Sequence, residues 1–228
     1  MLRPAPVPRP GGWLWLGWVA ATMLGALGGL LLAALVVPFA VGLPMPGAPA
    51  LWPAILAGAA LLYWGGIGVA QGVALARIVP GARGDIWAAV SLVAAVAGLL
   101  LSIAFGWIPA AALADVLFQH PELIGDLLVA WTIYGATVMG LGQALLLRRY
   151  LRGGLWWAPA PGLGAVVGLA VLSAGWPGAL PGASSDVRLE PLFLTTAVSW
   201  AGAAMLSGLV LVVLLRRAPA GPVPASPT

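Results

Sequence analysis

The chain has 228 residues, of which 62% are hydrophobic and 7% charged, with a formal net charge of +4. Soluble domains carry about a quarter charged residues, so this composition excludes a water-soluble globule and predicts a protein of the lipid bilayer. The chain also lacks cysteine and lysine, which excludes disulfides, thiolate metal ligands, thiol catalysis and lysine Schiff bases.

Six apolar segments follow one another along the chain, each long enough to cross a hydrocarbon core of about 30 Å. They are residues 13–37, 54–76, 86–107, 127–147, 157–176 and 192–215. The first run is too long for a signal peptide and is predicted to be a retained span. We therefore expect an all-α polytopic membrane protein with one six-helix membrane domain over residues 13–217. Residues 1–12 are expected to be a Pro-rich cytoplasmic tail, and residues 218–228 a disordered cytoplasmic Pro/Ala tail.

The distribution of arginine predicts the orientation of the chain. If each segment crosses once, one side holds Asp85 and nine of the ten arginines, namely Arg3, Arg9, Arg77, Arg83, Arg148, Arg149, Arg152, Arg216 and Arg217. Arginine-rich short loops stay in the cytoplasm, so we expect both termini on the cytoplasmic side of a bacterial inner membrane. Charge gathered at span ends does not indicate a nucleic-acid partner.

Tryptophan supports the same orientation, because indole prefers the headgroup level of a bilayer. The expected cytoplasmic belt contains Trp13, Trp15, Trp18, Trp87, Trp156 and Trp157, and the expected outer belt Trp52, Trp107 and Trp176.

An internal repeat relates the first, third and fifth segments, and another relates the second, fourth and sixth. Trp18, Trp87 and Trp157 are each followed eleven residues later by glycine, while three further glycines each precede an arginine by nine residues. A period of about 70 residues predicts three parallel two-helix hairpins, at about 13–80, 82–152 and 153–217, related by rotations near 120° about an axis lined by small and apolar residues. The recurring glycines are predicted to let helices approach closely; they are Gly25, Gly29, Gly98, Gly164 and Gly168 in the first helices, and Gly68, Gly140 and Gly208 in the second.

Two glutamines are the most polar side chains predicted within the membrane. Gln71 and Gln143 stand at equivalent positions in the first two repeats, and Leu211 takes that position in the third. They are interpreted either as an interhelical hydrogen bond, worth about 0.6 kcal/mol, or as a ligand contact. Leu211 favours the first interpretation and predicts that Leu can replace Gln143 with the fold intact.

Hydroxyl side chains gather in the outward halves of the segments, at Ser102, Thr132, Tyr134, Thr137, Ser173, Thr195, Thr196 and Ser199. Most are expected to bond to a carbonyl one turn back in their own helix. The alternative is that several converge on a shallow outward pocket for a neutral ligand.

His120, in the segment with Asp115, Glu122 and Asp126, is expected to be a solvated turn residue and not a metal ligand. Residues 110–119 are expected to form a short helix on the outer surface.

The recurring order of Gly-x-x-Gln, Arg, Trp and a Gly-rich helix resembles a group of bacterial multi-span membrane proteins that are mostly uncharacterised. The resemblance covers the repeated core and implies no reaction, substrate or cofactor. Because no nucleophile and base pair is visible, we expect no enzyme, no catalytic residues and no cofactor. The leading hypothesis is a structural or assembly protein that binds a membrane-protein partner or a second copy through helix faces such as the Gly25/Gly29 stripe. The alternative is a small-solute permease or substrate-binding membrane subunit that uses the hydroxyl-rich outer half.

Overall fold

The computed structural model describes residues 11–41, 48–79, 81–104, 123–175 and 189–217, and every regular element within them is helical. The helices are α1 (Gly12–Val41), α2 (Ala48–Ile78), α3 (Gly84–Ala104), α5 (Leu123–Leu147), the 3₁₀ helix η1 (Gly154–Trp157), α6 (Ala160–Gly175) and α7 (Leu189–Arg217). Each of the six predicted apolar segments thus overlaps one of the six long helices.

Four helical stretches are long and apolar enough to cross a bilayer, namely Gly12–Ala33, Leu61–Ile78, Gly154–Gly175 and Leu194–Arg217. The described parts of α3 and α5 include shorter apolar stretches, Gly84–Gly98 and Trp131–Leu147. The chain is therefore an all-helical protein with the helices of a membrane protein.

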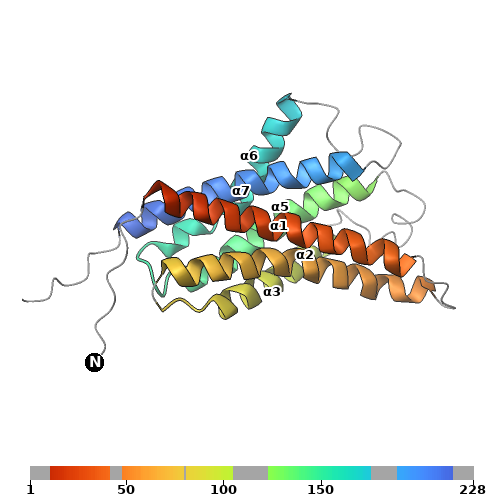
Figure 1. Ribbon diagram of the computed structural model, residues 1–228, viewed down its shortest axis with the longest axis horizontal. Coiled ribbons are helices and arrows are strands. Elements are labelled where there is room, and N and C mark those ends of the chain that lie inside the picture. Colours follow the sequence, from red (N-terminus) through yellow and green to blue (C-terminus); the bar gives the residue numbers. More distant parts are fainter. Residues whose placement is uncertain (1–10, 42–47, 80, 105–122, 176–188, 218–228) are drawn as a thin grey trace, which may run out of the picture.

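The six long helices pack side by side in the order of the sequence, and the ring that they form is closed. Each helix contacts the next one along the chain, and α7 returns to contact α1. Figure 1 shows the start of α1 and the ends of α2, α5 and α7 at the same end of the bundle, while the far end of α6 projects beyond α7. We call the shared end, where the arginines of these helix ends lie, the arginine end.

Glycines of the first helices allow each pair of consecutive helices to touch through their backbones. A Cβ atom added to Gly29 would lie 2.6 Å from the carbonyl oxygen of Tyr63. One added to Gly98 would lie 2.7 Å from the Cα of Gly135, and one added to Gly168 would lie 2.4 Å from the carbonyl oxygen of Val198. No side chain fits at those distances, so the close packing of three helix pairs depends on glycine. The pairs are α1 with α2, α3 with α5, and α6 with α7.

Glycines of the second helices face the next helix pair. A Cβ atom added to Gly68 would lie 2.9 Å from the Cβ of Ser91. One added to Gly140 would lie 2.3 Å from the carbonyl oxygen of Ala158, and one added to Gly208 would lie 3.0 Å from the ring of Trp18. Contacts between the pairs are therefore also made at the recurring glycines.

The two other recurring glycines of the first helices, Gly25 and Gly164, also pack against helices of the same chain. A Cβ atom at Gly25 would lie 2.7 Å from the Gly66 carbonyl oxygen, and one at Gly164 would lie 2.4 Å from that of Gly202. The Gly25/Gly29 stripe is thus covered by α2, and the expectation that it offers a face to a partner is wrong.

The turns at the arginine end use glycine for a different reason. Gly81, between α2 and α3, and Gly153, before η1, have φ angles of 80° and 79°, a region that side chains with a Cβ rarely adopt. After η1 the chain restarts as α6 at Ala160. Trp157 consequently lies in η1, and not on the continuous helix that was predicted to begin there.

Candidate functional site

Three tryptophans from three helix pairs meet inside the ring at the level of η1. The rings of Trp18, Trp87 and Trp157 have centroids 5.2 to 6.0 Å apart and meet edge to face. Each side chain is at most 1% exposed. We call these residues the three-tryptophan cluster. Their predicted place in a headgroup belt is wrong. Where small and apolar residues were predicted to line the axis, the residues of this cluster are apolar but large.

The side chains of Trp13 and Trp156 differ, because they are 86% and 73% exposed at the arginine end. Those two are placed as a headgroup belt would require. The spacing of tryptophans along the chain did not distinguish the two roles, because both occur at the start of a helix.

Each indole N–H group of the cluster donates a hydrogen bond to the helix that precedes it in the ring. Trp87 Nε1 donates to Gln71 Oε1 (3.4 Å), Trp157 Nε1 to Gln143 Oε1 (3.0 Å) and Trp18 Nε1 to Ser207 Oγ (3.0 Å). The three bonds thus link α2 to α3, α5 to η1 and α7 to α1.

Gln143 is the centre of this polar network. Its amide nitrogen donates to Gln71 Oε1 and to Ser91 Oγ, both at 2.9 Å. Gln71 in turn donates to Thr22 Oγ1 at 3.2 Å. All four side chains are buried. The two glutamines therefore bond to each other within a network larger than one interhelical bond, so we expect the replacement of Gln143 by Leu to cost more than such a bond is worth.

Three members of the network were missed in the sequence, namely Thr22, Ser91 and Ser207. Thr22 and Ser91 stand four residues after Trp18 and Trp87, on the same helix face, so this spacing was the available signal. At the third position Pro161 follows Trp157 by four residues. Leu211, at the place of the two glutamines, is fully buried in the apolar cluster that contains the three tryptophans.

A second aromatic cluster, made of Tyr63, Trp64, Trp131 and Trp200, fills the ring farther from the arginine end. The Trp64 ring centroid lies 5.4 Å from that of Trp200 and 5.9 Å from that of Trp131. The Trp200 indole N–H donates to the Tyr63 hydroxyl, and the Trp131 indole N–H donates to the Ala95 carbonyl at 3.4 Å. Within the described residues the buried Trp64 indole nitrogen has no hydrogen-bond partner.

Several of the hydroxyl side chains bond to a carbonyl of their own helix, as was expected for most of them. Thr137, Ser173 and Ser199 donate to carbonyls of Ile133, Ala170 and Thr195 in their own helices. Thr132 bonds to Tyr63. Thr132, Thr195, Thr196 and Ser199 are at most 8% exposed, whereas Tyr134 is partly buried. Among the described residues most of these hydroxyl side chains therefore bond within the protein, and Thr132 joins the second aromatic cluster through Tyr63.

Some predicted residues lie outside the described part of the chain. These are His120, Asp115 and Glu122, the short helix at 110–119, the outer-belt residues Trp107 and Trp176, and the side chains of Trp52, Ser102 and Asp126.

The contrast between Trp64 and Trp200 gives a testable prediction. Trp200→Phe removes a bonded N–H and one of the two hydrogen bonds of the Tyr63 hydroxyl, whereas Trp64→Phe removes an N–H that has no partner among the described residues. Both variants lose the same ring volume. We expect Trp200→Phe to lower the free energy of unfolding by about 1 kcal/mol more than Trp64→Phe, measured by thermal unfolding in detergent. Equal losses would contradict the assigned bonding.

Comparison of the chain with protein families, with curated proteins and with solved structures finds no match.

Proposed function

We propose that this chain is a non-enzymatic structural or assembly protein of the membrane. The observation that carries the proposal is that two aromatic clusters fill the interior of the helix ring at two levels. A permease needs a hydrated path, and a substrate-binding subunit needs a cavity with a few convergent polar groups. Here the polar groups around Gln143 bond to one another, as a rigid scaffold requires.

We infer that the six helices all cross the bilayer as three repeated hairpins arranged around one axis. The order of the contacts supports this inference. Gln71, on the second helix of the first hairpin, accepts the Trp87 N–H of the second hairpin, and Gln143 accepts the Trp157 N–H of the third. The third hairpin completes the cycle with Ser207, which accepts the Trp18 N–H of the first.

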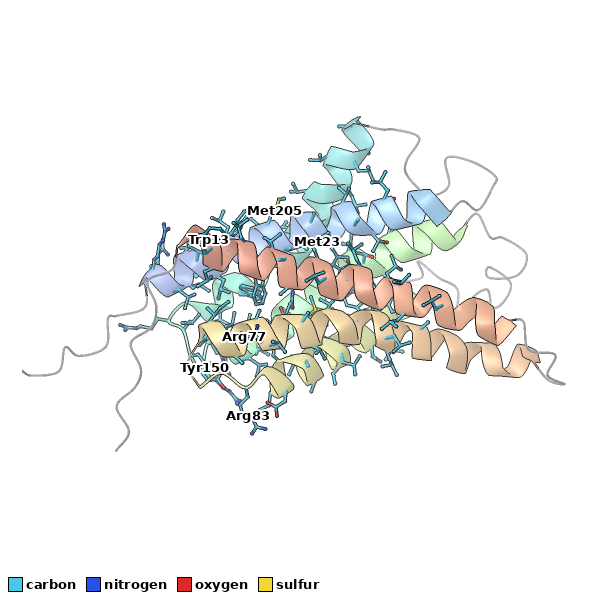
Figure 2. The ribbon with its side chains drawn as sticks, viewed as in Figure 1. Trp13, Met23, Arg77, Arg83, Tyr150 and Met205 are labelled. Atoms are coloured by element: carbon cyan, nitrogen blue, oxygen red, sulfur yellow. The ribbon has the colours of Figure 1, made fainter. Side chains whose placement is uncertain are left out.

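We also propose that the arginine end faces the cytoplasm of a bacterial inner membrane, with both termini on that side. Figure 2 shows Arg77, Arg83 and Tyr150 at this end of the bundle. All seven arginines among the described residues belong to it, and Asp85 is the one acidic residue among the described residues that lies at the same end of the bundle. An excess of arginine in short loops retains them in the cytoplasm.

The chain lacks cysteine, so single-cysteine variants report this orientation directly. We expect Arg152→Cys to react with a membrane-impermeant maleimide only after the cells are opened, and Ser184→Cys to react in intact cells. The reverse pattern would refute the orientation.

The partner of such a scaffold is expected to be another membrane protein or a second copy of this chain, and not a nucleic acid. Because α2 covers the Gly25/Gly29 stripe, the surface left for a partner is the outer, lipid-facing one, where large apolar side chains such as Leu24, Val93 and Leu163 are exposed. Such a surface also fits the lipid bilayer itself.

Purification in a mild detergent, followed by native mass spectrometry, tests the proposal. We expect a stoichiometric complex with a second membrane protein or a homo-oligomer that dissociates in a harsh detergent. The alternative function, a small-solute permease or binding subunit, would be supported if the protein in liposomes took up labelled neutral solutes faster than empty liposomes. That result would overturn the scaffold proposal.

A further inference from the structure

A narrow crevice opens at the arginine end between the α2–α3 turn and the end of α5. Its floor is apolar and buried, formed by Leu75, Trp87 and Leu147, and its mouth carries Arg83, Arg149 and Tyr150. The enclosed volume of about 20 Å³ accommodates roughly one water molecule. A small-molecule substrate does not fit inside, so any ligand must sit at the mouth.

The charges around the mouth are unequally neutralised. Arg83 forms an ion pair with Asp85, in which Arg83 Nε donates to Asp85 Oδ1 at 3.1 Å. Within the described part of the chain, Arg149 has no carboxylate within salt-bridge distance. The mouth therefore carries a net positive charge that an anion would balance.

An apolar stripe leads from Arg149 into the membrane-facing surface. Leu141 and Leu145 precede Arg149 by eight and four residues, so the three lie on one side of α5 and its continuation. Both leucines are about half exposed. A ligand that combines a negative headgroup with an acyl chain would match the guanidinium group and the leucines together.

We propose that the mouth of this crevice binds the headgroup of an anionic phospholipid, with Arg149 as the main phosphate ligand and Arg83 as a second cation weakened by Asp85. The acyl chain lies along Leu145 and Leu141. Basic pockets between membrane helices on the cytoplasmic side bind such headgroups through charge-assisted hydrogen bonds. The proposal requires only that the bundle lies in a bilayer, and it is independent of the assembly role.

Native mass spectrometry in micelles that contain equal amounts of dioleoyl phosphatidylglycerol and dioleoyl phosphatidylcholine measures the selectivity. We expect the full-length protein to retain phosphatidylglycerol preferentially. Arg149→Gln should weaken its apparent affinity about fivefold, the effect of one arginine near an anionic surface. The matched control is Arg216→Gln, which removes the same charge from the arginine end but does not line the crevice, and it should change the affinity less than twofold.

Asp85→Asn gives an independent signature, because it frees Arg83 and should strengthen phosphatidylglycerol binding. A merely structural role of the ion pair would not produce a gain. Equal losses in Arg149→Gln and Arg216→Gln would overturn the proposal in favour of diffuse attraction. Equal retention of the two lipids would overturn it as well, and so would complete displacement of phosphatidylglycerol by millimolar inorganic phosphate, which would identify a site for the free anion.

Discussion

Gly29→Val should separate α1 from α2 and lower the free energy of unfolding by about 3 kcal/mol, at the upper end of what overpacking usually costs. The reason is that a Cβ at this position would lie 2.6 Å from the Tyr63 carbonyl oxygen and 2.9 Å from that of Leu62. Backbone atoms cannot move aside as a side chain can, so the helices themselves must shift. The expected decrease in melting temperature in detergent is about 10 °C.

The neighbouring residue supplies the control. A Cβ at Gly28 would meet nothing within 4 Å, so Gly28→Val adds the same atoms to the same helix on its open side. We expect its melting temperature to stay within about 2 °C of that of the original chain. If both variants melt alike, the close approach of α1 and α2 does not depend on glycine.

Gln143→Met is expected to cost about 3 kcal/mol, because it keeps the side-chain volume but removes three hydrogen bonds. The buried Trp157 indole N–H loses its acceptor, and Ser91 and Gln71 each lose a donor. Of these the unpaired N–H is the largest loss, since Gln71 still accepts from Trp87 and Ser91 still donates to the Trp87 carbonyl. Thermal unfolding in detergent measures the loss.

Two comparisons isolate the network as the cause. Leu145→Met makes a substitution on the exposed side of the same helix and should have little effect. Trp157→Phe should be less harmful in the Gln143→Met background than in the original chain, since its N–H has no acceptor there. Additive losses in the double variant would show that the two residues are not coupled.

The helices and their order could be predicted from the sequence because a bilayer imposes a length and a composition on every crossing segment. Residues 13–37 and 192–215 were thus recognised within the limits of α1 and α7. It could also be predicted that Gly29 and Gly68 contact another helix closely, because a small residue on an apolar helix indicates close packing. Their partners were not, because the sequence alone does not say which helix a given face touches.

The candidate site was less predictable for the same reason. Trp18 and Trp156 both occur near the start of a segment, yet one is buried and the other exposed, and only the three-dimensional neighbours distinguish them. Gln143 was recognised as polar and interhelical, with Gln71 at the equivalent position 72 residues away, but its bond to Ser91, 52 residues away, was not predicted. The spacing of four residues after Trp87 marks the helix face of Ser91, but it does not say which side chains of other helices meet it there.

The hydrogen bond from Trp18 to Ser207 has a consequence for the synthesis of the protein and its folding in the membrane. The two residues are 189 positions apart, and α7 must leave the ribosome before Trp18 finds its acceptor. At roughly 5 to 20 residues per second, the first helix waits about 10 to 40 s with an unpaired indole N–H in lipid. A chain whose synthesis stops before α7 keeps this unpaired N–H, and the unpaired group distinguishes it from the complete protein. Membrane quality-control proteases are therefore expected to degrade truncated chains that lack α7 faster than the full-length protein, in which the ring has closed.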